Sequence, residues 1–314
     1  MIYLIAIAAF ITAVFTSAIQ SGASIAFAAI GEVISERAGV INLGLEGLML
    51  VGALTGVIVQ VENGNPALAL FAAGLAAALL ASIHAFLVIG LNSNQIVSGI
   101  AISILGAGVT GLLGRGYVGV KFDGIAKFEI PVLKDIPFFG PVLFQQDSLV
   151  YLLLLVSLGA YLLINRTRYG LHLRSVGEDP QAAYAQSVAV QRTRVIAVLL
   201  GGFLAGIGGG HLSLAYTYAW SERMTVGRGI IAVGLVIVAG WRPLWTLLAA
   251  FMFGALTVLH PKLQAAGINV SPYLVKMLPY LFTIVALTLA TIRFKRSGQG
   301  MPAALMKQFL PGQT

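Results

Sequence analysis

Five polar side chains lie within or beside strongly apolar sequence at residues 31–52, which reads GEVISERAGVINLGLEGLMLVG; they are Glu32, Glu36, Arg37, Asn42 and Glu46. An ionisable group in a lipid-like environment is costly unless it pairs with another group or faces water. The chemistry that these residues offer is therefore hydrogen bonding and charge recognition. We expect Glu36 and Arg37 to end a helix at the lipid–water boundary.

Asn42 and Glu46 are a second kind of signal, because they stand four residues apart amid Ile, Leu and Met. That spacing predicts one face of a helix, with its polar side chains pointing toward the protein interior. Two interpretations stay open, a hydrogen bond between packed helices or a part of a substrate path. A polar break at residues 92–95, Asn-Ser-Asn-Gln, is another place where irregular backbone could line a cavity.

A short helix is predicted in the polar stretch 166–194. Asp179 followed by Pro180 is a favourable N-cap and first-turn pair, and residues 181–185 continue the helix. Arginines flank it on both sides, which indicates a helix at the membrane surface. We expect it to dock onto a partner protein; the alternative is an ordinary amphipathic connector.

Small residues crowd the stretch GGFLAGIGGG at 201–210, where Gly202, Gly206 and Gly210 are spaced by four. Such spacing lets helix backbones approach closely in lipid. We therefore expect these glycines to serve helix packing. The alternative is a broken helix around a binding site at mid-membrane.

The sequence lacks the patterns of nucleotide binding, metal binding and catalysis. It has no GxxxxGK[ST] motif and no Gly-Lys pair, which argues against a P-loop. Its four histidines stand apart, no HExxH motif occurs, and cysteine is absent. We expect no metal, no cofactor bound by this chain and no enzymatic activity.

The elements that position these residues follow from composition. Of 314 residues, 58% are hydrophobic and 10% charged, whereas soluble domains carry about 25% charged residues. The net charge of +8 arises from basic residues at the ends of apolar runs, so we expect a lipid bilayer as the surroundings and no nucleic acid as a partner. No Lys or Arg precedes the first apolar run, which indicates a retained membrane segment rather than a cleaved signal peptide.

Nine apolar runs approach the roughly 20 residues that span a bilayer. They lie at 2–30, 40–60, 67–91, 95–116, 148–165, 195–215, 228–241, 244–260 and 273–292. They predict an all-α polytopic transmembrane bundle of nine to ten segments, and a single domain over 1–314. The tenth segment would be a half-helix at about 21–36, which would put the N-terminus inside.

Basic residues in short loops predict the orientation. The segment 166–194 holds five arginines against two acids, and the tail at 293–307 holds four basic residues and no acid. Both are predicted to be cytoplasmic. The loop at 117–147 holds three lysines against four acids, so we expect it on the extracytoplasmic side.

The stretch SERAGVINLGLEGLMLVGA at 35–53 closely resembles the signature of ABC importer permeases of the ribose/nucleoside/branched-chain amino acid superfamily, above all its nucleoside branch. Leu48-Met49 stands where Met-Met is commoner. VGEDPQAAYAQSVAV at 176–190 resembles the cytoplasmic loop of that family, with Asp179 where Asn is usual. The glycine-rich stretch and GWRP at 240–243 match the later helices in character, so the resemblance covers nearly the whole chain.

The resemblance implies the shorter permease of an importer of type II-like architecture, in the bacterial cytoplasmic (inner) membrane with a cytoplasmic C-terminus. Its implied partners are a second, longer permease in a heterodimer, cytoplasmic ABC ATPase domains that hold ATP-Mg, and an extracytoplasmic substrate-binding protein. The residues that match the coupling helix, and would meet the ATPase, are Gly177, Glu178, Asp179, Pro180, Ala182 and Ala183.

The nucleoside branch implies a nucleoside as the substrate. A flat base on a polyol suits aromatic stacking together with polar hydrogen-bonding groups. We expect contacts along the path from Phe27, Asn42, Glu46, Asn94 and Gln95. Simple sugars of the ribose or galactose type and riboflavin are alternatives within the class, and a secondary transporter is the alternative outside it.

Overall fold

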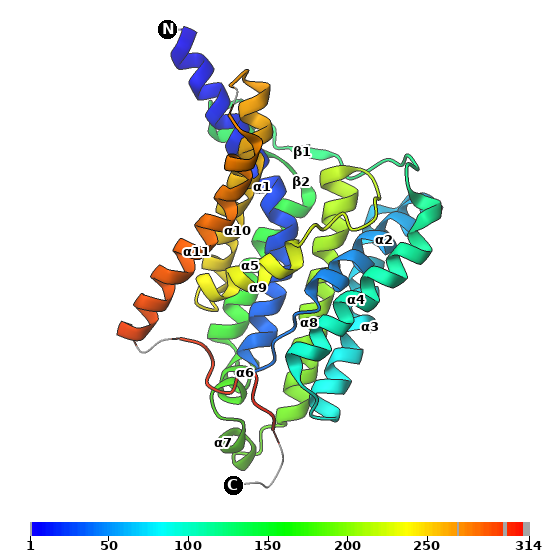
Figure 1. Cartoon of the computed structure of the whole chain (residues 1–314), viewed down its shortest axis with the longest axis vertical. Coiled ribbons are helices and arrows are strands. Elements are labelled where there is room, and N and C mark those ends of the chain that lie inside the picture. The colour runs from blue at the N-terminus through cyan, green and yellow to red at the C-terminus, as the bar shows by residue number, and fades with distance from the viewer. Residues whose placement is uncertain (1, 269, 298–299, 310–314) are drawn as a thin grey trace.

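The computed structural model describes residues 2–268, 270–297 and 300–309, and this part of the chain is a bundle of long helices with one short pair of antiparallel strands (Figure 1). Eight helical segments are long and apolar enough to cross a membrane. The predicted all-α polytopic bundle is confirmed. The elements are α1 (Ile2–Arg37), α2 (Leu45–Asn63), α3 (Pro66–Ala85), α4 (Gln95–Leu113), β1 (Lys127–Glu129), β2 (Gln145–Asp147), α5 (Ser148–Arg166), α6 (Arg168–Glu178), α7 (Pro180–Ala185), α8 (Val190–His211), α9 (Arg228–Val238), α10 (Pro243–Ala265) and α11 (Pro272–Ser297).

The predicted number of segments needs two corrections. Residues 2–37 form one continuous helix, so the half-helix at 21–36 and the ten-segment version are wrong. The run 228–241 yields only the 11-residue α9, which is roughly 16 Å long at 1.5 Å per residue. That is about half of the hydrocarbon thickness of a bilayer, so α9 does not cross it alone.

Helix α1 runs through the middle of the bundle. Every residue from Ser21 to Glu36 is buried, which explains why this helix is apolar on all of its faces. It packs lengthwise on α8 and α10. Gly22 and Gly254 lie where α1 meets α10, and a side chain on either would collide with the backbone of the opposite helix.

A second packed group joins α2, α3 and α8. Gly202 and Gly206 of α8 lie against α3, and Gly206 also meets Gly52 of α2, while Gly210 lies against Ala73. The three glycines named from the sequence thus stand at close helix contacts. Dispersion contacts of this kind hold helices together in lipid, where apolar burial gives little driving force.

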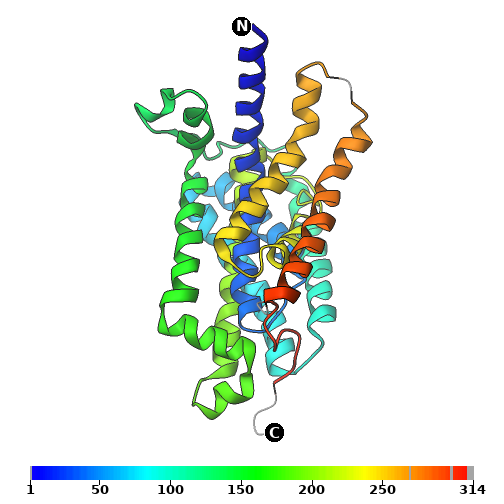
Figure 2. The ribbon, with the colours of Figure 1, turned by 90° about the vertical axis from the view of Figure 1, so that its left-hand side faces the viewer.

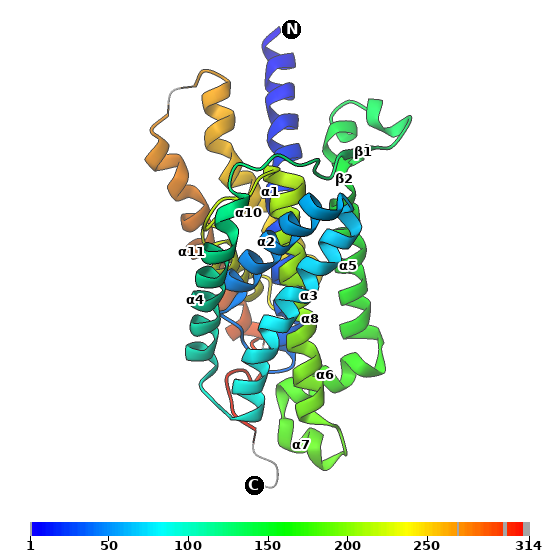
Figure 3. The ribbon, with the colours of Figure 1, turned by 90° about the vertical axis from the view of Figure 1, so that its right-hand side faces the viewer.

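The two ends of the bundle carry different elements. Helices α6 and α7 and the segment 300–309 lie at one end, which we call the α7 end, and the views in Figures 1 and 2 agree on this. The loop 117–147 lies at the other end, beside the N-terminal part of α1 (Figure 3). Within that loop β1 pairs with β2, with Lys127 opposite Asp147.

We predict that Gly52→Val lowers the thermal stability of the protein in detergent. The added atoms would meet the backbone of Gly206, which cannot rotate away as a side chain could, and overpacking of this kind costs about 1–3 kcal/mol or more. Gly108→Val on α4 is the matched control, because no other side chain or helix among the described residues lies within 4 Å of a Cβ at that position. Equal melting temperatures of the two variants would contradict the prediction.

Candidate functional site

Two helices that start inside the bundle meet at Glu46. Its side chain stands in the first turn of α2 and accepts hydrogen bonds from the start of α9: from Oγ1 of Thr225 at 2.5 Å and from the backbone N–H groups of Gly227 and Gly229 at 2.8 Å each. A side chain at Gly229 would collide with the backbone of α2. The glutamate thus satisfies N–H groups that a helix leaves free at its N-terminus, where the helix dipole favours negative charge.

Arg228, the first residue of α9, brings a positive charge beside this carboxylate. Its Nη1 donates to the carbonyl oxygen of Ser21 at 2.8 Å and contacts Oγ of Ser24 at 3.1 Å, both on α1. Its guanidinium group stands over the ring of Tyr216, 5.5 Å from the ring centroid. Glu46 and Arg228 are both half-buried, and ionisable groups at membrane depth mark a path that admits water or substrate. We call the set formed by Glu46, Tyr216, Thr225 and Arg228 the α2–α9 site.

The short α9 lies halfway along the bundle, in front of α1 in Figure 1. It follows a π-helical turn at Leu212–Thr217, which ends α8, and a non-helical stretch over 218–227. Short helices joined by irregular backbone are the means by which transporters line a binding site at mid-membrane. The short α9 and the irregular backbone before it are of this kind, whereas α2 is long enough to cross a membrane.

The segment before α2 corrects the expectation for Asn42. Helix α2 begins only at Leu45, because the chain turns at Gly39, whose φ is +86°. Asn42 therefore lies outside the helix, and the predicted shared helical face with Glu46 is wrong. Its Oδ1 accepts from the N–H of Gly44 at 2.8 Å, and its own N–H donates to Oε1 of Glu32 at 2.6 Å.

Other side chains fasten the same segment. The Oε1 of Gln95 accepts from the N–H of Ile41 at 2.9 Å, while a ring nitrogen of His84 lies 3.1 Å from the carbonyl oxygen of that residue. The hydroxyl of Ser103 donates to Leu43 at 2.9 Å. Non-helical backbone at membrane depth is tolerated where the protein satisfies its polar groups. In this structure Asn42 and Gln95 accept hydrogen bonds from backbone N–H groups of the non-helical segment before α2.

Phe27 and Asn94 lie elsewhere. Phe27 is fully buried in α1, with its ring centroid 6.4 Å from that of His211. Asn94 is exposed at the turn between α3 and α4, where its Oδ1 accepts from the N–H groups of Ile96 and Val97 and caps α4. Of the five residues predicted for the path, Glu46 alone belongs to the α2–α9 site.

The sequence reasoning passed over Arg228, Thr225 and Tyr216. One signal pointed to Arg228, because it is the charged residue that opens the apolar run 228–241. Nothing local pointed to Thr225, whose partner Glu46 lies 179 residues earlier.

The end of α1 differs from the expected lipid–water boundary. Glu36 is fully buried, and its Oε2 accepts a hydrogen bond from Nε1 of Trp241 at 2.5 Å. Arg37 is half-buried and donates from Nε to the carbonyl oxygen of Trp241 at 3.0 Å. The pair therefore joins α1 to the turn between α9 and α10, and the boundary interpretation is wrong for Glu36.

At the α7 end, the predicted short helix begins at Pro180, and Oδ1 of Asp179 caps it by accepting from the N–H groups of Gln181 and Ala182 at 3.0 Å each. Glu178, Asp179 and Ala182 are exposed. Ala183 is buried instead, because another part of the chain covers it.

That covering part is the segment 302–309, which we call the C-terminal strap. The N–H of Ala304 donates to the carbonyl oxygen of Gly177 at 2.9 Å. The ring of Phe309 is 4% exposed and packs in one cluster with Val176, Ala183 and Val190. Tyr184 stays half exposed with its ring 5.8 Å from that of Phe309. The strap and α7 together form one surface at this end.

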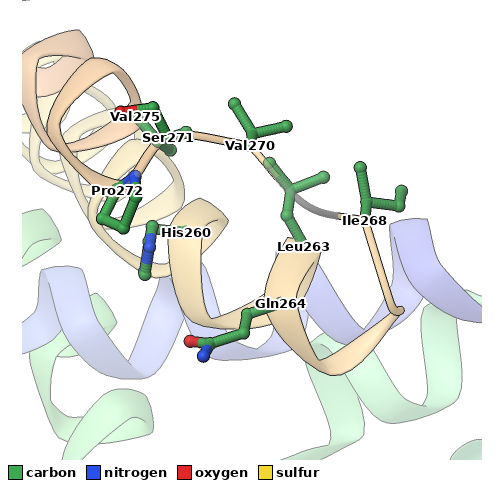
Figure 4. A pocket seen from close by; sticks show the side chains of 8 residues that line it. All are labelled: His260, Leu263, Gln264, Ile268, Val270, Ser271, Pro272 and Val275. Atoms are coloured by element: carbon green, nitrogen blue, oxygen red, sulfur yellow. The ribbon is translucent and has the colours of Figure 1, made fainter.

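A small hollow of about 360 Å³ lies at the turn between α10 and α11 (Figure 4). Among the described residues that line it, His260 is the only titratable one, and Leu263, Gln264 and Val275 are among its neighbours. The hollow is at the opposite end of α10 from Trp241 and is separate from the α2–α9 site.

Several known proteins are similar to this chain in sequence over most of its length. Residues 7–287 match a family described as branched-chain amino acid transport system, permease component. The chain is 38% identical to the putative glucose ABC transporter permease protein TsgC13 of Haloferax volcanii, over 96% of this chain and 98% of that relative. It is 34% identical to the nucleoside ABC transporter permease protein NupC of Lactococcus lactis, over 84% of this chain and 87% of the relative.

A further relative is the glucose ABC transporter permease protein TsgB13, also of Haloferax volcanii, at 26% identity over 85% of this chain and 76% of the relative. No solved structure matches the chain. The family match spans the bundle from α1 to α11 and includes the α2–α9 site. The chain therefore belongs to the family of branched-chain amino acid transport system permease components, and it is a non-catalytic, multi-pass permease of an ABC importer.

Proposed function

We propose that this chain forms part of the membrane path of an importer that carries a nucleoside, and that the α2–α9 site is where the substrate passes. The observation that carries the proposal is the half-buried Glu46 where the N-terminal ends of α2 and the short α9 meet. An acid, an arginine and an aromatic ring gather there. These groups suit the hydroxyl groups of a ribose and the flat face of a base.

Glucose is the second candidate substrate. The relative TsgC13 is named as a putative glucose permease and is similar to this chain over nearly its whole length. A hexose offers hydroxyl groups without a flat aromatic base. The two candidates therefore differ in what they require of Tyr216, and a Tyr216→Leu variant separates them: transport of a nucleoside should suffer, whereas transport of a hexose should change little.

The proposed assembly has three kinds of partner. A second permease subunit, a longer paralogue, completes the path; the occurrence of TsgB13 and TsgC13 in one organism supports this pairing. Cytoplasmic ABC ATPase domains, which hold ATP-Mg, bind the surface of α7 and the C-terminal strap. A substrate-binding protein delivers the solute at the opposite end, where the loop 117–147 lies.

The proposed location is the cytoplasmic membrane, with the α7 end and the C-terminal part of the chain in the cytoplasm. Five arginines at 166–194 support this orientation. Because the chain has no cysteine, a single introduced cysteine is the one thiol of the protein, and its labelling shows on which side of the membrane it lies. We predict that Lys127→Cys reacts with a membrane-impermeant maleimide on intact cells, and that Gln186→Cys reacts only after the cells are opened. The reverse pattern would contradict the orientation.

The central experiment is ATPase activity of the importer in nanodiscs, with this chain, its partner permease, its ATPase and its binding protein. Nucleosides, ribose, galactose, glucose and riboflavin are added in turn. Stimulation by nucleosides supports the first candidate, and stimulation by glucose alone replaces it with the second. Uptake into vesicles by this chain without ATP or partners would contradict the proposed mechanism and indicate a secondary transporter.

A further inference from the structure

A cavity of about 970 Å³ lies between α5, α10 and α11, toward the α7 end. Figure 1 shows α11 leaning away from the rest of the bundle as it approaches that end. The volume lies within the range of small-molecule sites. None of the residues that line the cavity belongs to the α2–α9 site, so this is a separate feature of the molecule.

One end of the cavity is strongly basic. Among the described residues, Arg37, Arg174, Arg242 and Arg293 line it together with one acid, Glu178, for a net formal charge of +3 from these five side chains. Arg37 lies within the electrostatic reach of Glu178, which attracts it, and of Arg174 and Arg242, which repel it. Like charges that are partly withdrawn from water repel one another, so an anion among them would stabilise the arrangement.

The other end of the cavity is apolar. Leu248 and Met252 of α10 and Phe282 of α11 form this part of its wall. Met252 is nine residues beyond the start of α10 at Pro243, which places it roughly 13 Å further along the helix axis. The cavity thus runs from charged groups at the end of the helices to hydrocarbon side chains within the bundle.

An aromatic side chain marks the level at which the character of the wall changes. Trp245 lines the cavity and is 55% exposed. Tryptophan is enriched where lipid headgroups meet the hydrocarbon layer. Trp245 lies in the first turn of α10. With this tryptophan at the boundary, the four arginines of the cavity would lie among lipid headgroups, and the apolar wall would lie among the acyl chains.

We propose that this cavity is a binding site for an anionic phospholipid, with the phosphate among the arginines and an acyl chain along the wall formed by Leu248, Met252 and Phe282. The planar guanidinium group donates paired hydrogen bonds to phosphate oxygens. Basic pockets between membrane helices recognise anionic headgroups on the same principle. A soluble phosphate would satisfy the arginines and leave the apolar wall without a partner, so the two-part lining favours a lipid. The leaflet is the inner one if the orientation proposed above holds.

The test uses the purified full-length chain, stripped of lipid in detergent, and native mass spectrometry. Dioleoyl-phosphatidylglycerol, dioleoyl-phosphatidylcholine and inorganic phosphate are the probes. The variant is Arg174→Gln combined with Arg293→Gln. The matched control is Arg166→Gln combined with Arg168→Gln, because those arginines are exposed near the same end and do not line the cavity. A third variant, Leu248→Trp, fills the apolar wall and leaves all four arginines in place.

We expect phosphatidylglycerol to bind at least about tenfold more tightly than phosphatidylcholine. The cavity double variant should lose that preference and the control should keep it, while Leu248→Trp weakens binding of the lipid. Equal binding of the two lipids, or full binding by both cavity variants, would overturn the proposal. Displacement of the lipid by millimolar inorganic phosphate would assign the site to a soluble anion and overturn the lipid assignment.

Discussion

Replacing Glu46 with alanine is expected to lower substrate uptake by the assembled importer roughly 30-fold or more. Three donors would lose their acceptor: the hydroxyl of Thr225 and the N–H groups of Gly227 and Gly229. Each buried donor left without a partner costs about 1–3 kcal/mol. A loss of about 2 kcal/mol at the start of α9 corresponds to that factor, since about 1.4 kcal/mol is tenfold.

The measurement is uptake of radiolabelled substrate into proteoliposomes that contain the complete importer and ATP. Glu62→Ala is the control, because this glutamate is at the far end of α2 and exposed, where it accepts a hydrogen bond from the hydroxyl of Tyr117. Glu46→Gln separates two roles. The amide oxygen can replace Oε1, which accepts from Thr225 and Gly227, but the NH2 group cannot accept from Gly229. If the carboxylate only caps α9, Glu46→Gln should therefore recover part of the uptake with an unchanged KM; if it contacts substrate, KM should stay raised. Normal uptake by Glu46→Ala would contradict both roles.

Removing the ring of Phe309 is expected to abolish most of the stimulation of ATP hydrolysis by substrate, while the chain still inserts into the membrane. This ring fills the contact between the C-terminal strap and the cluster of Val176, Ala183 and Val190. Truncating a buried phenylalanine to alanine costs about 3–5 kcal/mol. Ala304 and Leu305 stay buried and the hydrogen bond from Ala304 to Gly177 remains, so the loss falls on the part of the strap that covers Ala183. Helix α7 would then lose the support on its inner side.

The measurement is substrate-stimulated ATPase activity of the complex in nanodiscs, compared between Phe309→Ala and Met306→Ala. Met306 belongs to the same strap but is 46% exposed, so its truncation should leave stimulation near the normal level. Tyr184→Arg tests the outer side of α7, because Tyr184 is half exposed. If Tyr184→Arg abolishes stimulation and Phe309→Ala does not, α7 binds the ATPase without help from the strap.

Features with a local physical cause could be predicted from the sequence. The long apolar runs gave the membrane helices, because about 20 apolar residues are needed to cross hydrocarbon. Asp179 and Pro180 gave the start of α7, since capping involves only residues two and three places away. The spacing of Gly202, Gly206 and Gly210 pointed to close helix contacts, which the structure places on α2 and α3.

Features that depend on distant partners could not be predicted. Glu36 looked like a residue at the membrane surface because its partner Trp241 lies 205 residues later. Asn42 looked helical because hydropathy does not report a backbone turn such as the one at Gly39. The shortness of α9 was hidden for the same reason. Residues 229–241 are apolar throughout, and turns on both sides limit the helical part.

The C-terminal strap also orders events during synthesis of the protein. Helices α6 and α7 leave the ribosome before α8 to α11, but the strap that covers Ala183 is translated only after α11. The surface at the α7 end is therefore completed only when every membrane helix of the bundle has been made. An ATPase that recognises the completed surface would not bind nascent or prematurely terminated chains. Incomplete permeases would then not stimulate ATP hydrolysis.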